Sequence, residues 1–353
     1  MRIKTPYFIF DRKLFSAMIR DYANYGKIYF PIKANDHEMI ISEINKNECA
    51  FEVDSIEHMN RLIHYCVSPD RMCYSYPIRE VADIKKALRL GVRLFVVDSF
   101  DEYEKIACLT TKASFIVRIN VLSILKSKLR HEQNKWGLSI PEAITLISKI
   151  RTNNQYLAGV SFYITSEIQQ EDAFEVVLNA IASQFPNIGV DFINIGGGIS
   201  LDKLRSLAGC LDEVKRKVKA RYIVLEPGRH LLNPCIDMVV SVTAVRNISA
   251  NRLVFINAGI YSGLLDAAVK NKKYLVEDKL QESTSALAPT YICGSSSDIS
   301  DTLGEYELRM NLAVGDSLII KECGAYSAVM QTHFCRKDHV NMVLKRTHNC
   351  VSW

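Results

Sequence analysis

The chain has 353 residues, of which 48% are hydrophobic and 24% are charged, and its formal net charge is +5. This balance is typical of a globular protein with ample material for a core. The positive charge is spread without a long basic run, which argues against a nucleic-acid partner. The apolar stretch at residues 7–10 is too short for the core of a signal peptide, and no later run is long enough to span a bilayer. We therefore expect a cytoplasmic protein without a membrane partner.

The ten cysteines are scattered at irregular intervals. They form no Cys-x-x-Cys pair, and the histidines form no cluster at metal-binding spacing, so we expect no metal site. Several cysteines lie within apolar segments, which is typical of free thiols in a reducing compartment.

Short apolar segments alternate with amphipathic ones from about residue 22 to residue 227. The strand candidates are residues 28–30, 50–53, 72–74, 94–97, 115–119, 159–163, 192–195 and 222–225. The helix candidates between them are residues 36–45, 56–65, 79–90, 100–108, 141–151, 172–184 and 201–220. Eight strands, each but the last followed by a helix, predict an α/β fold with a closed (β/α)8 TIM-type barrel.

The pattern changes after Pro234, where only strand segments and turns follow. The candidates are residues 237–245, 252–257, 290–293, 317–321 and 341–345. They predict a separate β-domain that the first strand, residues 7–11, also joins. The expected domains are therefore a barrel over residues 12–234 and a β-domain made of residues 1–11 and 235–353.

Lys33 closes the apolar run at residues 28–32. Burial of an ammonium group at a strand end lowers its pKa, which favours the free amine that attacks an aldehyde. The carboxyl ends of the strands in such barrels also carry the active-site groups. The alternative is a lysine that ends a strand and points into solvent.

Three glycines, Gly196, Gly197 and Gly198, follow another apolar strand and lead into a helix that starts near Ser200. Backbone N–H groups beside a helix N-terminus attract a phosphate dianion. The alternative is a tight turn between strand and helix that binds no ligand.

The segment Glu226-Pro227-Gly228-Arg229 follows the last strand of the predicted barrel. A carboxylate at this place suits a protonated pyridine nitrogen, and Gly228 allows the backbone to approach a cofactor closely. Arg229 is a candidate for binding phosphate, and a Glu226–Arg229 salt bridge remains an alternative. A lysine for an aldehyde, glycines for a phosphate and an acid for a pyridine nitrogen together predict pyridoxal 5'-phosphate.

In their order along the chain, these segments resemble the fold type III pyridoxal-phosphate decarboxylases, the ornithine, lysine, arginine and diaminopimelate decarboxylase family. The resemblance runs from Tyr7 to about His333 and implies an alanine-racemase-like barrel followed by a β-domain. It implies that Lys33 bonds the aldehyde carbon of the cofactor. The cofactor-binding residues that it implies are Lys33, Arg118, Tyr163, Gly196, Gly197, Gly198, Glu226, Gly228, Arg229 and Tyr326.

The resemblance also implies a homodimer with shared active sites. In the family, the loop that corresponds to residues 294–301 crosses the dimer interface. Asp298 in this loop keeps the acid that helps to select the distal group of the substrate, and Lys270 falls near a second substrate-binding position. The run at residues 134–137 matches a Lys-Phe-Gly segment of the family.

Two departures concern catalysis. Ser297 stands where the family carries the cysteine that protonates the carbanion, so Cys293, a water or Tyr326 is an alternative proton source. Tyr163 stands where a histidine normally lies over the cofactor ring, and its aromatic face can stack there.

Two further departures lie near the second barrel strand, where Glu52 replaces the usual Asp and His58 replaces an acid.

The expected reaction is decarboxylation of an amino acid, either a diamino acid of the ornithine, lysine or diaminopimelate type or a modified amino acid in a biosynthetic pathway. An amino-acid racemase is the first alternative, and the acid at Glu226 argues against it because racemases place an arginine at the pyridine nitrogen. The second alternative is a non-catalytic relative, which Ser297 and Tyr163 leave open.

Overall fold

The computed structural model describes residues 3–122, 124–125, 135–164, 168, 170–249, 251–278, 286–336 and 338–345. The chain divides into two compact units. The barrel unit comprises Met18–Lys33 and Glu38–Gly228, and the sheet unit comprises Met1–Ala17, Ala34–His37 and Arg229–Trp353. The domain limits expected at residues 12 and 234 stay a prediction.

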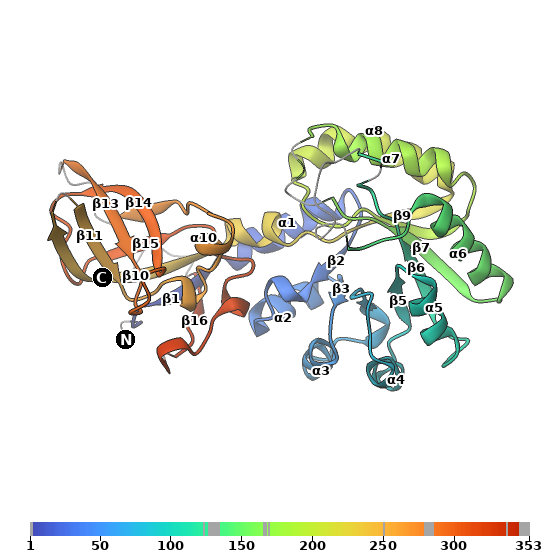
Figure 1. Ribbon diagram of the computed structural model, residues 1–353, viewed down its shortest axis with the longest axis horizontal. Coiled ribbons are helices and arrows are strands. Elements are labelled where there is room, and N and C mark those ends of the chain that lie inside the picture. Colours follow the sequence, from blue (N-terminus) through green and yellow to red (C-terminus); the bar gives the residue numbers. More distant parts are fainter. Residues whose placement is uncertain are drawn as a thin grey trace. The chain divides into compact units, whose positions relative to one another are not determined.

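The barrel unit contains a closed barrel of eight parallel strands, in which β2 pairs with both β3 and β9 (Figure 1). The strands are β2 (Lys27–Pro31), β3 (Ala50–Val53), β4 (Met72–Tyr74), β5 (Leu94–Val97), β6 (Ser114–Arg118), β7 (Tyr156–Ser161), β8 (Val190–Asn194) and β9 (Ala220–Leu225). The predicted TIM-type barrel is thereby confirmed. Every strand begins and ends within a few residues of its expected place.

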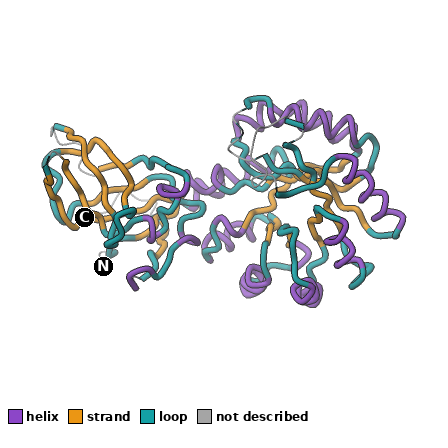
Figure 2. The backbone as a smooth tube through the Cα atoms, viewed as in Figure 1, coloured by secondary structure: helices purple, strands orange, loops and turns teal. Residues whose placement is uncertain are grey.

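A helix follows each of the first seven barrel strands, and these helices surround the strands (Figure 2). They are α2 (Glu38–Lys46), α3 (Ile56–His64), α4 (Val81–Leu90), α5 (Phe100–Ala107), α6 (Ile140–Thr152), α7 (Ala173–Gln184) and α8 (Leu201–Val218). Serines cap several of them: the side chains of Ser55, Ser99 and Ser200 accept from backbone N–H groups of the first turn. One helix, α1 (Arg12–Ala23), precedes β2 and was not expected from the sequence.

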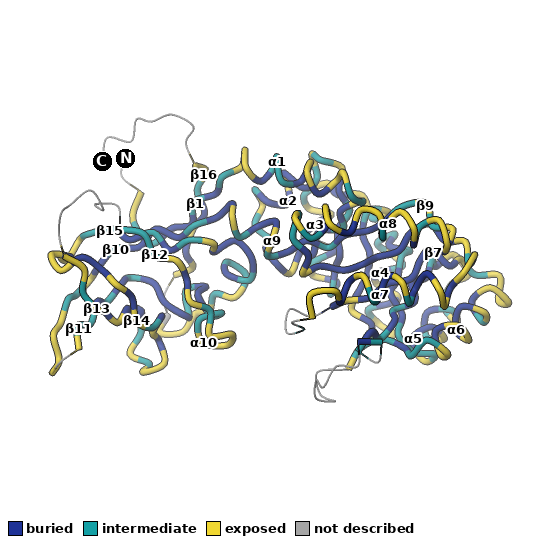
Figure 3. Tube along the Cα trace, turned by 90° about the horizontal axis from the view of Figure 1, so that it is seen from above, coloured by how far each residue is buried: buried dark blue, intermediate teal, exposed yellow. Residues whose placement is uncertain are grey.

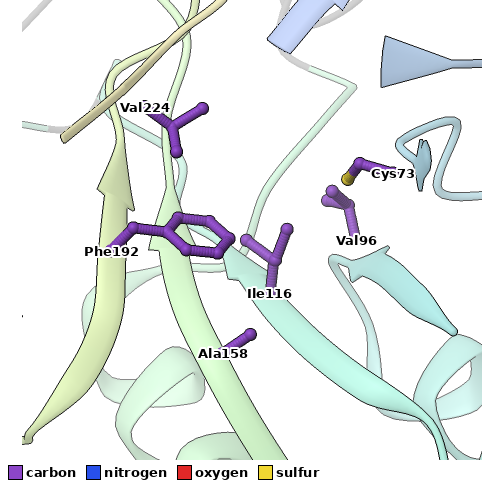
Figure 4. Close-up of a cluster of buried hydrophobic side chains, with 6 residues drawn as sticks. All are labelled: Cys73, Val96, Ile116, Ala158, Phe192 and Val224. Carbon is purple, nitrogen blue, oxygen red and sulfur yellow. The ribbon is translucent and has the colours of Figure 1, made fainter. Parts of the chain in front are cut away.

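The core of the barrel is built from apolar side chains on the strands, which are buried along most of their length (Figure 3). Six of these side chains form one cluster: Cys73, Val96, Ile116, Ala158, Phe192 and Val224. In Figure 4 the Phe192 ring extends from β8 toward Ile116. A Cβ on Gly159 would lie 2.9 Å from the Phe192 ring, so the glycine leaves the space that this ring occupies.

The sheet unit contains an eight-stranded sheet in the order β12-β15-β10-β11-β13-β14, with β1 paired to β10 and β16. Its strands are β1 (Tyr7–Phe10), β10 (Ile236–Ile248), β11 (Asn251–Ile256), β12 (Val276–Asp278), β13 (Leu287–Cys293), β14 (Thr302–Arg309), β15 (Ser317–Ile320) and β16 (Asn341–Leu344). The first strand joins this sheet as expected. Two short helices of this unit were not expected from the sequence. One is α9 (Arg229–Leu232), within the range predicted for the barrel, and the other is α10 (Asp266–Val269), within the range predicted to be all-β.

Two strands of this sheet, β12 and β14, were missed. In β14 the charged Glu305 and Glu307 point outward, whereas Tyr306 and Leu308 are buried. Gly304 interrupts this alternation because its φ of +94° departs from extended backbone. The β pattern is therefore visible only once the partner strand β13 is known.

Within the described ranges, no helix is long and apolar enough to cross a membrane.

Candidate active site

Lys33 lies directly beyond β2, in the short 3-10 helix Ile32–Ala34. Its Nζ atom lies 2.8 Å from Oε1 of Glu52 and 3.0 Å from Oδ2 of Asp54. Glu52 belongs to β3, and Asp54 directly follows this strand. The Lys33 side chain is 43% exposed, whereas that of Glu52 is only 3% exposed. The lysine thus reaches from the end of one strand to two carboxylates at the end of its neighbour.

The expected burial and lowered pKa of Lys33 are wrong. Desolvation acts to lower the pKa of Lys33, but the attraction of Glu52 and Asp54 outweighs it and raises that pKa above its ordinary value. The sequence shows the lysine without its partners, because only the pairing of β2 with β3 brings the two carboxylates to it. Asp54 was therefore missed as a site residue.

Glu52 is buried at the base of this group. Burial raises the pKa of Glu52 to about 7, although the attraction of Lys33 acts to lower it. The single hydroxyl of Ser75 lies between the two acids: it contacts Glu52 and lies 2.9 Å from Oδ1 of Asp54, so its proton is shared between them. In the described part of the chain, Oε2 of Glu52 has no hydrogen-bond partner. Burial also acts to raise the pKa of Asp54, but the attraction of Lys33 outweighs it and lowers that pKa.

Glu226 follows β9 and lies near the same end of the barrel. Asn194, the last residue of β8, donates from Nδ2 to Oε1 of Glu226 over 2.7 Å. Burial raises the pKa of Glu226, whereas the Asn194 hydrogen bond and the charges of Lys33 and Arg118 act to lower it. The charges of Lys33 and Arg118 thus act on Glu226, and the roles of these three residues toward a cofactor stay a prediction. Asn194 was missed because an amide at a strand end has no distinctive sequence pattern.

The three glycines form the turn between β8 and α8. Gly196 and Gly198 have φ of +71° and +75°, a left-handed conformation that favours glycine. A Cβ on Gly197 would lie 2.4 Å from the carbonyl oxygen of Glu226, so this position also requires glycine. The N–H of Gly196 donates to Oδ1 of Asn194.

The N–H groups of Gly197 and Gly198 donate to no acceptor among the described residues. Gly197 is buried, and a buried backbone N–H without a partner is rare in proteins. The two free donors lie beside the N-terminus of the 18-residue helix α8. This arrangement fits a phosphate group.

Tyr163 and Gly228 also belong to the barrel unit. The Tyr163 side chain is 44% exposed, and its Cδ2 atom would lie 3.3 Å from a Cβ on Gly196, so the tyrosine borders the glycine turn. Gly228 is buried two residues beyond Glu226.

Arg229 and Tyr326 meet in the sheet unit. The guanidinium carbon of Arg229 lies 4.4 Å from the centroid of the Tyr326 ring, and Nη2 of Arg229 lies 3.4 Å from Oδ2 of Asp266. Tyr326 has φ of +55°, which is uncommon for a residue other than glycine. Asp266 is a further charged residue that the sequence did not reveal.

The loop that follows Cys293 is organised by a buried acid. Asp301 is 4% exposed and accepts hydrogen bonds from the N–H groups of Ile260 and Ser296. Asp298 accepts from the hydroxyl of Tyr261 over 2.6 Å. The loop therefore has an internal scaffold, Asp301, and a second acid, Asp298, whose charge remains near the surface.

The remaining expected residues are separate from these contacts. Ser297 is exposed in the same loop, and burial raises the pKa of Cys293. Lys270 is exposed just beyond α10, and its role in substrate binding stays a prediction. In the run at residues 134–137, Asn134 lies outside the described residues, and the N–H of Gly137 donates to Oδ2 of Asp98 over 3.1 Å.

The raised pKa of Glu52 predicts a pH dependence of stability. Between pH 4.5 and about 7, Glu52 keeps its proton in the folded protein but loses it in the unfolded chain. The free energy of unfolding of the ligand-free protein should therefore fall as the pH rises through this range. Asp54 titrates below this window and Lys33 above it, whereas Glu226, whose pKa burial also raises, contributes to the same fall. We expect Glu52→Gln to flatten this fall in urea titrations at a series of pH values, and the exposed Glu57→Gln to leave it unchanged. An equally steep fall in Glu52→Gln would contradict the assignment.

The comparisons with known proteins agree with this geometry. Residues 12–233 match the family model described as the pyridoxal-binding domain of pyridoxal-dependent decarboxylases. A lysine/ornithine decarboxylase of Selenomonas ruminantium is 23% identical over 350 residues, which cover 94% of this chain and 88% of that protein. A diaminopimelate decarboxylase of Helicobacter pylori is 24% identical over 365 residues, with coverage of 94% and 88%.

Among solved structures, the lysine/ornithine decarboxylase of Vibrio vulnificus in complex with putrescine has a TM-score of 0.85 at 20% sequence identity. The match covers 97% of this chain and 94% of that chain, and it confirms the expected combination of a barrel with a β-domain. The family match extends over more than half of the chain. The protein therefore belongs to the pyridoxal-dependent decarboxylase family, and the enzyme class and the pyridoxal phosphate cofactor expected from its sequence are confirmed.

Proposed function

We propose that this protein removes the α-carboxylate of a diamino acid of the ornithine, lysine or diaminopimelate type as carbon dioxide. The observation that carries the proposal is the grouping of Lys33, Glu226 and the free N–H groups of the glycine turn at one end of one barrel. The names of the relatives, a lysine/ornithine and a diaminopimelate decarboxylase, support the substrate class. A modified amino acid in a biosynthetic pathway remains the second candidate.

The residues present fit pyridoxal phosphate. The free N–H groups of Gly197 and Gly198 suit its phosphate, and the half-buried carboxyl of Glu226 suits its pyridine nitrogen. When bound, the cofactor supplies an aldehyde carbon for an amine and a pyridinium ring that accepts the electron pair left by carbon dioxide.

Lys33 must lose a proton before its amine can act as a nucleophile. Its raised pKa keeps it charged, and the two carboxylates 2.8 and 3.0 Å away are the groups that can take the proton. Glu52 is the better acceptor of the two, because burial raises its pKa to about 7 whereas the pKa of Asp54 is lowered. Glu52 and Asp54 thus hold and receive the Lys33 proton.

Glu226 holds a proton at the pyridine nitrogen. Burial raises the pKa of Glu226 and makes its lone negative charge costly, so a cationic N–H partner stabilises it. Asn194 orients the carboxyl through its hydrogen bond to Oε1. A carboxylate at this place favours decarboxylation over racemisation, the alternative reaction on this fold.

Asp298 carries the negative charge that suits the distal ammonium of a diamino acid, and the hydroxyl of Tyr261 orients it. Ser297 lies beside it, and the proton returned to the substrate comes from Ser297, Cys293, Tyr326 or a water. Two copies of the chain form the homodimer in this proposal, so that each supplies the Asp298 loop to the barrel site of the other.

Lys33 should carry the covalent link to the cofactor. We expect borohydride reduction of the loaded protein to leave a pyridoxyl group on the tryptic fragment with residue 33, as detected by mass spectrometry. Lys33→Ala should lose both this label and the near-visible absorbance. Lys27→Ala, at the other end of the same strand, should keep both. A label on a different lysine would refute the proposal.

The substrate class is tested by carbon dioxide release from a panel of amino acids. We expect release from at least one of ornithine, lysine and diaminopimelate, and a loss of at least about 100-fold in kcat in Glu226→Gln, because the proton at the pyridine nitrogen is then no longer held. The absorbance of bound cofactor should persist in that variant. Turnover of none of the three amino acids would refute the diamino-acid assignment, and full activity of Glu226→Gln would remove its role.

Shared sites predict complementation between two inactive variants. Lys33→Ala and Asp298→Ala should each be inactive alone. After mixing and subunit exchange they should regain about one quarter of wild-type activity, since half of the random dimers are mixed and each holds one intact site. Sedimentation confirms that both variants are dimers. Absence of rescue in dimeric protein would show that the sites are not shared.

A further inference from the structure

The barrel unit has a cavity near the amino ends of strands β2, β3 and β9. This cavity of about 780 Å³ is bordered by Tyr29 of β2, Ala50 of β3 and Tyr222 of β9. Tyr29 precedes Lys33 by four residues, and Tyr222 precedes Glu226 by four. The cavity therefore lies at the amino ends of these strands, and the candidate active site lies beyond their carboxyl ends.

The lining of this cavity is cationic. Its charged residues are the bases Arg20, Lys27, Arg71, Lys215 and Arg221 and the acids Glu48 and Asp70. The structure gives Lys215 an ion pair with Asp212, and Arg221 one with Asp191. Within the described residues Arg20 and Lys27 form no ion pair. The cavity therefore presents an excess of positive charge, part of which is not neutralised by neighbouring acids.

The floor of the cavity supplies a hydrogen-bond donor. Tyr29 and Tyr222 both line this cavity. Burial raises the pKa of both tyrosines, so each hydroxyl keeps its proton at neutral pH. A tyrosine hydroxyl can donate that proton in a hydrogen bond to an anion. The Tyr222 ring stacks on Phe192 with a centroid distance of 5.5 Å, which anchors the floor in the barrel core.

Gly26 allows the backbone before β2 to lie close to the backbone of β9 at Ile223. A Cβ at Gly26 would lie 2.7 Å from the carbonyl oxygen of Ile223, so only glycine allows the approach. Lys27 follows directly, and its Nζ atom lies 4.0 Å from the centroid of the Tyr222 ring. An unneutralised ammonium and a hydroxyl donor thus face the same hollow.

We infer that this cavity is a binding site for a small phosphorylated anion of nucleotide size. Its volume lies in the range of ordinary small-molecule sites, roughly 300 to 1,000 Å³. Phosphate oxygens suit the free cations Arg20 and Lys27 and the Tyr222 hydroxyl. The charge excess disfavours a polyamine, because like charges repel there. The site is separate from the glycine turn of the cofactor site, and its occupation does not depend on the proposed reaction.

Isothermal titration of the cofactor-loaded protein tests this site, because the phosphate of the cofactor already fills the glycine turn. The probes are pyrophosphate and ADP, each without metal ions, and spermidine serves as the cationic comparison. We expect saturable binding of at least one phosphate probe with a Kd below about 1 mM, weakened by added salt, and none of spermidine. Absence of saturable binding of both phosphate probes, or binding of spermidine alone, would overturn the inference.

A pair of matched double variants locates the binding. Arg20 lies in the last turn of α1, and Arg89 lies in the last turn of α4 away from the cavity. Arg20→Ala/Lys27→Ala should weaken the probe by at least about tenfold, whereas Arg89→Ala/Lys85→Ala removes the same charge and should leave the Kd unchanged.

All four substituted side chains are exposed, so both proteins should keep the wild-type thermal unfolding midpoint. Tyr222→Phe should weaken binding about threefold or more through loss of its donor. Equal losses in the two double variants would show a non-specific charge effect and would overturn the site.

Discussion

The closure of the barrel is the constraint on which the candidate site depends. Strand β2 pairs with β3 on one side and with β9 on the other, so the residues that follow these three strands meet at one end. Lys33 and Glu226 are far apart in the sequence, yet the charge of Lys33 acts to lower the pKa of both Glu52 and Glu226. Without the β2–β9 pairing that closes the ring, the lysine and the acid for the cofactor ring would lie at opposite edges of an open sheet.

The charged residues at this end of the barrel shift one another's pKa values. Lys33 and Arg118 are the cations, and Glu52, Asp54 and Glu226 are the acids. Burial alone would neutralise the two glutamates, and the nearby lysine limits that effect without removing it. The result is a lysine that stays charged and a neighbouring glutamate that can exchange a proton near neutral pH. Such a pair is suited to chemistry in which an amine must be charged at one step and free at another.

The two ends of the same strands have different chemical character. The carboxyl ends carry both acids and bases, and free N–H groups lie beside the N-terminus of α8. At the amino ends tyrosines form the floor of a cationic hollow. Phe192 and its neighbours fill the space between the two ends, so that each site has a rigid base.

Local sequence determined most of the secondary structure and the chemical types at the site. Alternation of short apolar runs with amphipathic segments is a short-range property, and it predicts the eight barrel strands and their helices. Glycines 196–198, Lys33 and Glu226 were recognisable for the same reason, because each follows an apolar strand directly. Strand β14 was not recognisable in the sequence. Gly304 interrupts its alternation of buried and exposed residues, and the strand is identified by its pairing with β13.

Tertiary structure decided the surroundings of those residues. The sequence suggested a buried lysine with a lowered pKa. The fold instead places Asp54 and Glu52 beside Lys33, and their charges raise the pKa of the lysine. Asn194 and Asp266 acquire their roles in the same way, through partners 32 and 37 residues away along the chain. A pKa and an ion pair depend on distances through space, and these distances exist only after the strands have paired.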